Sequence, residues 1–414
     1  MLNTTSILKP RTINASSTLL TEGINSCKDK GRDNCGLEVI DLEEYDVVVV
    51  GGGVAGSVAA KFAAKSGFKT LLIEKLKTPR NKPCSGIQFQ YFEKLIGEKI
   101  PREKLCRNEL FKVEIITPKG RVLKGRMKML NFWRSTFDSW LNSLAVKTGA
   151  DFRDNTSLID FVESKDRIIV KIATENTRSE VKARYLIGAD GMLSKIRRKM
   201  RPQDFNKKAL GAAVNYYFIG DTNLDPNTLY IFYKRDFCPL MFAWVYLKDE
   251  KWVIGTGANE KPLEYVERFF NYVKEKYGLR GEIVKKEGFS STLKSTVYLG
   301  EGRILMVGDA AGLIDLYRGV GMDNAALSGR LAIKAITKAE EEGLEAVKAY
   351  EKLMRKVVKK IEANAEKQIK RLSSNNELEK SLSPLNMLKG GIHMLIANGI
   401  NKILPPEKLI FLPL

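Results

Sequence analysis

The stretch VVVVGGGVAGSVAAKFAAKSGFKTLLIEK, from Val47 to Lys75, decides the fold of this chain. It begins with a β-branched run that does not alternate with polar residues, which is typical of a strand buried on both faces. Glycines follow, then small residues suited to a helix, and then a second apolar run that ends at Glu74. Strand, glycine turn, helix and strand form a βαβ unit, whose crossover is expected to be right-handed.

The glycines of this unit, GGGVAG at residues 51–56, fit the pattern G-x-G-x-x-G. Gly51 allows the tight turn, Gly53 lets the backbone approach a pyrophosphate, and Gly56 lets the helix pack closely on the strand. The pyrophosphate is expected at the helix N-terminus, where unpaired N–H groups and the helix dipole favour anions. Glu74 stands where an acid accepts hydrogen bonds from a ribose. The unit therefore predicts a dinucleotide site, but it does not distinguish NAD from FAD.

Two later segments bear on that choice. YLIGADG (185–191) and RILMVGDAAG (303–312) each join an apolar strand to a turn that contains Gly and Asp. Asp309 can accept a hydrogen bond from a ribityl hydroxyl, and the helix that starts near Gly321 can offer N–H groups to the edge of a flavin. Taken singly, each segment is equally an ordinary turn at the end of a strand.

Composition bounds the class of protein. With 414 residues and 44% hydrophobic content, the chain can build a large core, arranged as one large domain or as two. The formal charge of +20 predicts attraction to acidic lipid headgroups, to an acidic protein donor or to nucleic acid, or it is only a solvated basic surface. We expect no nucleic-acid partner, because no RNA- or DNA-binding motif accompanies the charge.

Cysteine and histidine usage argues against several kinds of site. The five cysteines show no C-x-x-C spacing, so a zinc knuckle or a thioredoxin-like pair is not indicated, and the odd, sparse set favours a reducing compartment. His393 is the only histidine, which argues against a His-rich metal site and against a Ser-His-Asp triad. We therefore predict no metal and expect His393 to pack in its apolar surroundings.

The sequence also bears on where in the cell the protein resides. Every apolar run is broken well before the ~20 residues that a membrane span needs, so the sequence predicts a cytoplasmic protein with or without peripheral contact with a membrane. Residues 1–43 are predicted to be a flexible extension. The segment 382–414 has few charges, and three roles stay open for it: covering a substrate tunnel, lying on a membrane surface, or packing on the protein's own core.

The three dinucleotide-type segments, in this order and spacing, resemble the flavoprotein family that includes para-hydroxybenzoate hydroxylase, flavin-dependent halogenases and geranylgeranyl reductases. RSTFDSWL (134–141) resembles that family's Arg-x-x-Phe-Asp-x-x-Leu helix, in which the arginine approaches the cofactor. The resemblance covers roughly residues 45–340 and implies FAD. With the glycine unit, the expected cofactor-binding residues are Gly51, Gly53, Val54, Ala55, Gly56, Glu74, Lys75, Cys84, Arg134, Asp190, Gly191, Asp309, Gly321 and Met322.

The predicted fold class is α/β (α+β): a Rossmann-type FAD-binding domain with a parallel sheet, interleaved with an antiparallel-sheet substrate domain, and a C-terminal helical segment. The FAD-binding domain is expected at 44–110, 131–204 and 296–342, the substrate domain at 111–130 and 205–295, and the helical region at 343–414. Apolar and aromatic strands over 210–258 supply most of the substrate sheet. Helices are predicted over 88–97, 134–148, 262–277, 321–342 and 343–372, and strands over 158–164, 167–173 and 181–187.

Within the family, the geranylgeranyl reductase group is the most similar. KPCSG (82–86) resembles that group's Lys-x-Cys-Gly-Gly stretch beside the isoalloxazine, FAWVYL (242–247) resembles its substrate-facing Tyr-x-Trp-x-Phe-Pro strand, and KDEKWVIGTG (248–257) matches the hairpin that follows. Ser85 replaces a glycine, and residues 315–321 lack the usual Pro and acid of Asp-Pro-x-x-Gly-Glu-Gly. The chain is therefore identified as a divergent member of this group.

The resemblance implies an FAD-dependent oxidoreductase that reduces C=C bonds of an isoprenoid or other hydrophobic substrate. Cys84, Trp244 and Tyr246 are the expected catalytic residues, with Cys84, Tyr246 or a water as proton donor and the aromatic rings stabilising a developing cation. One alternative is an FAD-dependent monooxygenase of an aromatic or polyketide-like molecule, and another is a non-catalytic flavin-binding protein. A halogenase is disfavoured, since no Trp-x-Trp-x-Ile-Pro segment occurs.

The source of electrons stays open. No second G-x-G-x-x-G unit is present for NADPH, so electrons are expected either from NAD(P)H that binds transiently or from an external carrier such as ferredoxin. A basic protein suits an acidic electron-donor protein. A basic cluster after the Asp-Gly turn is either a solvated face or a landing site for such a donor or for a phosphorylated substrate; it comprises Lys195, Arg197, Arg198, Lys199 and Arg201.

Overall fold

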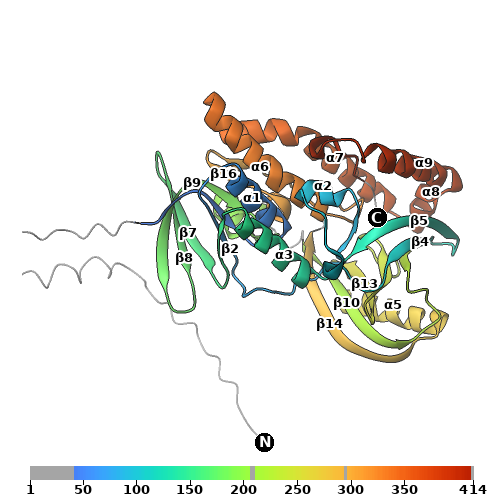
Figure 1. Ribbon diagram of the computed structural model, residues 1–414. Helices are drawn as coiled ribbons and strands as arrows, with labels where there is room; N and C mark the ends of the chain where they lie inside the picture. The colour runs from blue at the N-terminus through green and yellow to red at the C-terminus, as the bar shows by residue number, and fades with distance from the viewer. Residues whose placement is uncertain (1–41, 206–209, 293–295, 412–414) are drawn as a thin grey trace, which may run out of the picture. The chain divides into compact units, whose positions relative to one another are not determined.

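The computed structural model describes residues 42–205, 210–292 and 296–411, and the fold below is that of the unit Glu43–Leu414. The predicted N-terminal extension, residues 1–43, lies almost entirely outside the described residues. Two sheets organise the unit, and helices pack against both (Figure 1). The predicted fold class is confirmed.

The first sheet is built around the βαβ unit. Its strand order is β15-β16-β9-β1-β2-β6, and the pairs from β16 to β6 are all parallel. Val47, Val48 and Val49 have no exposed surface, as the non-alternating run predicted. A hairpin, β7 and β8, extends β9 in antiparallel fashion. The strands are β1 (Glu44–Val50), β2 (Thr70–Ile73), β6 (Asp151–Arg153), β7 (Ser157–Glu163), β8 (Ile168–Ala173), β9 (Arg178–Gly188), β15 (Gly300–Glu301) and β16 (Ile304–Met306).

Three helices pack together beside this sheet, with α1 (Val54–Lys65) between α3 (Arg134–Lys147) and α6 (Met322–Glu342) (Figure 1). α1 and α6 touch through their backbones, because a Cβ on Gly329 would overlap the carbonyl oxygen of Ala55. α1 follows β1 directly, and α6 follows β16 after a connection that contains a short 3₁₀ helix. The helices predicted over 134–148 and 321–342 are confirmed to within one residue at their ends.

The second sheet has the order β14-β10-β13-β12-β11-β4-β5-β3 and is antiparallel except between β11 and β4. α5 (Pro262–Tyr277), as predicted, packs on it through Phe269 and Val273. Its strands come in two runs along the chain, β3–β5 and β10–β14, each flanked by strands of the first sheet, so the two sheets are interleaved. They are β3 (Ile87–Phe89), β4 (Leu110–Ile116), β5 (Val122–Asn131), β10 (Leu210–Asp221), β11 (Thr228–Phe232), β12 (Ala243–Lys248), β13 (Lys251–Ala258) and β14 (Arg280–Thr292).

Some local predictions were wrong. Of the helix expected over 88–97, only α2 (Phe92–Ile96) forms, because Ile87–Phe89 pairs with β5 as β3. Sheet pairing overrides local propensity here. Strand β14 was not predicted, since it is rich in charged residues. The remaining short elements are α4 (Lys195–Met200) and the 3₁₀ helices η1 (Arg102–Lys104), η2 (Pro202–Asp204), η4 (Gly308–Ala311) and η5 (Pro406–Lys408).

The C-terminal region is helical, as expected, but it begins later than predicted. Gly343, with φ +66°, ends α6, and the next helix starts only at Ala346. It consists of α7 (Ala346–Arg371), α8 (Asn375–Ser381) and α9 (Pro384–Ile400) (Figure 1). In the part of the chain that the structure describes, no helix combines the length and the apolar character that a membrane crossing requires.

Candidate active site

The glycine loop joins the end of β1 to the start of α1. Gly51 has φ +113°, and a Cβ on it would overlap the carbonyl oxygen of Ala189. A Cβ on Gly56 would overlap the carbonyl oxygen of Gly51, so glycine is required at both positions. α1 begins at Val54 with Gly53 as N-cap, and its first N–H groups have no partners within the helix. The loop therefore has the form of an anion site.

Two arginines from separate segments approach this loop. Measured from the position that a Cβ on Gly53 would take, one guanidinium nitrogen of Arg80 lies at 3.4 Å and one of Arg134 at 4.0 Å. Arg134 is buried and makes two 2.7 Å hydrogen bonds to Asp138, whose carboxylate also lies 3.2 Å from Arg80. Guanidinium groups suit phosphate oxygens. The carboxylate of Asp138 thus contacts both guanidinium groups and fixes their positive charge beside the loop.

The pKa of Arg134 shows how this charge is secured. Burial lowers the pKa, but the Asp138 carboxylate and then Cys84 outweigh burial and raise the pKa of Arg134 above its ordinary value. Arg134 therefore keeps its positive charge although it is buried, and this charge is available to an anion at the loop.

Glu74 lies beside the loop at the end of β2, as predicted. Its Oε2 accepts a hydrogen bond from the N–H of Gly52 (3.0 Å) and pairs with Arg80 (2.9 Å), while Oε1 accepts one from the N–H of Leu76 (3.1 Å). The carboxylate is nearly inaccessible and fixed in place. Lys75, the next residue, is exposed.

Two buried polar atoms near the loop have no partner among the described residues: Nδ2 of Asn142 and Oδ1 of Asp190. The first lies 3.4 Å from where a Cβ on Gly52 would be, and the Cα of Asp190 lies 3.1 Å from the corresponding point on Gly51. Burial raises the pKa of Asp190. Gly191 follows with φ +80°. A diphosphate with a hydroxylated chain offers the partners that such atoms lack, so these residues fit FAD.

A second helix N-terminus lies near Asp309. The carboxylate of Asp309 pairs with Lys82 at 3.3 Å, and its Oδ1 lies 3.6 Å from where a Cβ on Gly321 would be. Gly321 is the N-cap of α6, and Met322 is its first residue. An acid and the N-terminus of α6 therefore stand together at this end of the first sheet, as the sequence predicted from residues 308–321.

The 82–86 segment contacts the starts of α6 and α3. The sulfur of Cys84, which is half-buried, is 3.7 Å from the sulfur of Met322 at the start of α6. Cys84 also interacts with Arg134 at the start of α3. A Cβ on Gly86 would overlap the carbonyl oxygen of Phe132, so the backbone of the segment lies directly against Phe132, which connects β5 to α3.

A buried lysine ties this segment to the second sheet. Lys248 ends β12, is 1% exposed, and donates a hydrogen bond to the carbonyl oxygen of Phe132, with its nitrogen 4.8 Å from the ring centroid of Trp133. Its nitrogen lies 2.8 Å from where a Cβ on Gly86 would be. Burial lowers the pKa of Lys248 to about 8. Its neighbour Asp249 accepts a 2.7 Å hydrogen bond from the indole of Trp133.

Trp244 and Tyr246 share the face of β12 that carries Lys248, because side chains two residues apart point to the same side of a strand. Trp244 is half-buried and its indole donates to Oδ1 of Asn215 at 2.9 Å. Tyr246 is 1% exposed, and burial, reinforced by Tyr217 and Cys84, raises its pKa well above the ordinary value. Cys84 and this aromatic face are therefore neighbours.

Sequence reasoning missed Arg80, Asn142 and Lys248. Arg80 stands in a segment without a recognised pattern, and Asn142 follows the 134–141 motif in a predicted helix without being part of it, so only their contacts identify them. Lys248 did carry a signal, since it continues the inward-facing series of Trp244 and Tyr246 along one strand. An inward lysine at the end of an aromatic strand is unusual enough to be noticed.

The basic cluster mostly serves local structure. Arg197 is buried and bonds Asp204 and the carbonyl oxygens of Thr296 and Ala310, and Lys199 bonds the carbonyl oxygen of Phe161. His393 was expected to pack, and this prediction was wrong. It is exposed on α9, because most of that helix faces solvent.

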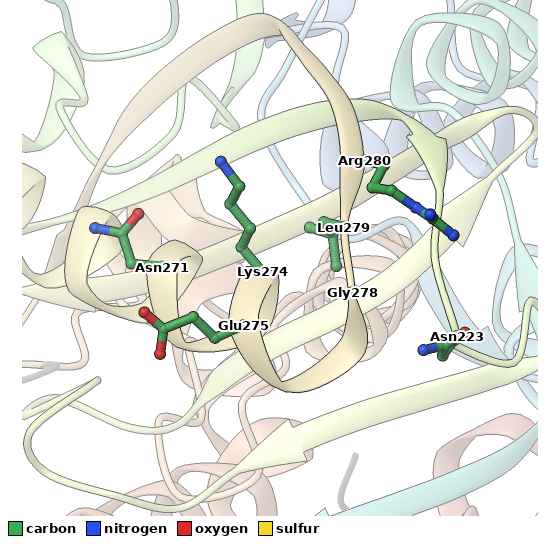
Figure 2. A pocket seen from close by; sticks show the side chains of 7 residues that line it. All are labelled: Asn223, Asn271, Lys274, Glu275, Gly278, Leu279 and Arg280. Carbon is green, nitrogen blue, oxygen red and sulfur yellow. The ribbon is translucent and has the colours of Figure 1, made fainter.

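A polar surface cavity of about 610 Å³ lies apart from the site, at the end of α5 (Figure 2). None of the predicted site residues lines it. Its lining consists of Asn223, Asn271, Lys274, Glu275, Gly278, Leu279 and Arg280.

Comparisons with known proteins agree with this geometry. The family described as FAD binding domain matches residues 44–365. A digeranylgeranylglycerophospholipid reductase of Thermoplasma volcanium is 31% identical over 326 residues, which cover 72% of this chain and 80% of the relative. A crystal structure of a geranylgeranyl bacteriochlorophyll reductase-like protein from Thermoplasma acidophilum superposes with a TM-score of 0.75 and 26% identity, over 84% of this chain and 95% of the other.

Aklavinone-11 hydroxylase, in a ternary complex with FAD and aklavinone, is a more distant structural neighbour. Its TM-score is 0.58 at 18% identity, over 75% of this chain and 65% of the other, so the likeness shows a shared fold alone. The family match extends over most of the described sheets and helices, and the reductase relative matches most of the chain. The chain therefore belongs to the FAD-binding-domain family of oxidoreductases and, within it, to the geranylgeranyl reductase group.

Proposed function

We propose that this chain is an FAD-dependent reductase of C=C bonds in an isoprenoid or other hydrophobic substrate. The observation that carries the proposal is the tie between Lys248 and the carbonyl oxygen of Phe132, beside Gly86. It holds the aromatic face of the second sheet against the Cys84 segment. The reductase relative supports the same reading through its name.

In this proposal, the loop and helix starts hold the cofactor. The N–H groups of Val54 and Ala55 and the guanidinium groups of Arg80 and Arg134 bind the diphosphate, and Glu74 binds the ribose. Asp309 and the first N–H groups of α6 bind the ribityl chain and the flavin edge. When bound, FAD supplies the hydride for the reduction.

The chain's own residues then serve the alkene. An isolated alkene accepts hydride poorly, so proton delivery must accompany it and positive charge develops on carbon. The rings of Trp244 and Tyr246 stabilise that charge and exclude water. Cys84 is the better placed proton donor, because it is half-buried whereas the raised pKa of Tyr246 makes this phenol a weak acid.

Two further parts of the proposal concern partners. Electrons come from NAD(P)H or from an external carrier such as ferredoxin, and the charge of +20 favours an acidic carrier. A hydrophobic substrate also calls for contact with a lipid phase, so we propose peripheral contact with a membrane.

The experiment is anaerobic turnover. Photoreduced protein is mixed under argon with an unsaturated prenyl lipid, and mass spectrometry is expected to show a gain of H₂ for each reduced bond. Cys84→Ser is expected to slow the reaction while the flavin absorbance is retained. An unchanged lipid, together with substrate-stimulated oxygen consumption under air with NADPH, would instead establish the monooxygenase. Tight flavin with neither activity would establish a flavin-binding protein.

A further inference from the structure

α9 presents large aliphatic side chains to solvent. Their exposed fractions run from 49% for Ile392 to 70% for Leu395, and Ile403, just after the helix, is 83% exposed. Spacings of three and four residues place them along one side of the helix. We call them the α9 stripe; it consists of Leu385, Leu388, Ile392, Leu395 and Ile396.

The opposite side of α9 attaches the helix to the protein. Met387 and Met394 pack against the core, and Ala397 is fully buried. The helix thus has two apolar sides, of which the protein covers one. In Figure 1, α9 lies with α8 in the red C-terminal part of the chain.

The end of α9 is firmly held, so the stripe is not the result of fraying. Lys94, on α2, donates hydrogen bonds to the carbonyl oxygens of Asn401 (2.8 Å), Lys402 (2.6 Å) and Leu404 (3.1 Å). Asn401 makes two hydrogen bonds with Ile410, of 2.7 and 2.8 Å. Phe411 stacks on Tyr91 at 5.7 Å between ring centroids.

The charges on α9 and on the segment that follows it are mostly positive. α9 contains no Asp or Glu, and Lys389, Lys402 and Lys408 are exposed on or beside it. Glu407 is the single acid between residues 382 and 411, and it pairs with Lys334 at 3.1 Å. An apolar stripe with lysines at its margin complements an anionic lipid surface.

We propose that the α9 stripe docks this chain on an anionic lipid membrane, with the aliphatic side chains entering the boundary between headgroups and acyl chains. This inference rests on the proposed function, because docking gives access to a hydrophobic substrate that resides in such a membrane. A second copy of the chain is the less favourable occupant. Pairing through α9 would bring two chains of charge +20 together, whereas an anionic surface attracts each of them.

The test uses the FAD-loaded, full-length protein and sedimentation with vesicles. Vesicles of phosphatidylcholine mixed with phosphatidylglycerol are compared with vesicles of phosphatidylcholine alone. The variant Leu388→Asp/Leu395→Asp is expected to weaken binding to the mixed vesicles by about tenfold or more, since each leucine loses its transfer into an apolar phase. Pure phosphatidylcholine is expected to bind the wild type more weakly.

The matched control is Leu263→Asp on α5, because Leu263 is 58% exposed and Leu388 is 62% exposed. It is expected to bind vesicles like the wild type, and flavin absorbance shows that each variant folds. Equal binding by the α9 variant and the wild type would overturn the proposal, since charge alone would then suffice. Light scattering that shows a dimer which the α9 variant dissolves, with vesicle binding unchanged, would also overturn it in favour of a second copy.

Turnover separates this inference from the proposed function. The α9 variant is expected to reduce a detergent-dispersed prenyl lipid like the wild type. Vesicle binding that depends on α9, without turnover of any prenyl lipid by the wild type, would leave the docking surface in place and remove the reductase.

Discussion

Two buried cations belong to the site, and they are held in opposite ways. Arg134, beside the glycine loop, has its carboxylate partner Asp138 one helical turn away, and its pKa is raised. Lys248, at the second sheet, has a carbonyl oxygen and an aromatic ring, and its pKa is lowered to about 8. The partner of Arg134 is therefore close to it in the sequence, whereas the partner of Lys248 is 116 residues away.

Removing the guanidinium of Arg134 is expected to have the largest effect. Arg134→Met leaves Asp138 buried with only Arg80 at 3.2 Å, and breaking a buried pair on one side costs about 3–5 kcal/mol. Urea denaturation of the FAD-loaded protein measures the loss, and the variant is also expected to retain less flavin. The double variant Arg134→Met/Asp138→Leu is expected to regain most of the stability, because no uncompensated charge remains. If the double variant were no more stable than the single one, the carboxylate would not be the reason that Arg134 tolerates burial.

Lys248 is expected to give a pH-dependent effect. Below pH 8 both the folded and the unfolded chain hold the proton, so the cost of burying the charge is complete. Between pH 8 and the ordinary value of 10.5 the folded state binds fewer protons than the unfolded state, so stability rises with pH by up to about 3 kcal/mol. Lys248→Met removes this titration. The unfolding free energy of the wild type minus that of the variant is expected to be larger at pH 10 than at pH 7; an equal difference at the two pH values would show that burial does not lower the pKa of Lys248.

The comparison of Arg134 with Lys248 also shows how much of the site can be predicted from the sequence. The βαβ unit, Glu74 and the start of α3 were predictable, because strand, turn and helix signals there fall within a few residues of one another. The helix over 262–277 was predictable for the same reason. Arg80 was not, since its partners Glu74 and Asp138 come from two segments that only the fold brings together.

The wrong predictions have a similar cause. His393 was expected to pack because its neighbours are apolar, but an apolar neighbourhood in sequence does not say which side of a helix the protein covers. β3 forms where a helix was expected, because these residues pair with β5 in antiparallel fashion. In both cases the deciding contact lies far away in the chain, as it does for Lys248 and Phe132.

A Cβ at the glycine loop is expected to have an intermediate effect. Gly56→Ala would place a methyl group against the carbonyl oxygen of Gly51, and such overpacking costs about 1–3 kcal/mol. Flavin retention after desalting is expected to fall with stability, because the loop must move. Gly125→Ala is the control, since nothing lies within 4 Å of its Cβ position. Normal flavin retention in Gly56→Ala would mean that the close contact of loop and helix is not needed for the site.

The smallest effect is expected at Glu74, which belongs to the glycine-loop region but already has internal partners. Glu74→Gln keeps the shape but has a single acceptor oxygen, so it can accept from the N–H of Gly52 or from that of Leu76, not from both, and it loses the charge that pairs with Arg80. A charge-assisted hydrogen bond to a ribose is about twice as strong as a neutral one, so FAD binding is expected to weaken by about tenfold. The backbone hydrogen bond that is lost is expected to cost about 1 kcal/mol of stability. Fluorescence titration of the deflavinated variant with FAD measures this. Unchanged affinity would separate Glu74 from the ribose and leave it the role of fixing Arg80 over the loop.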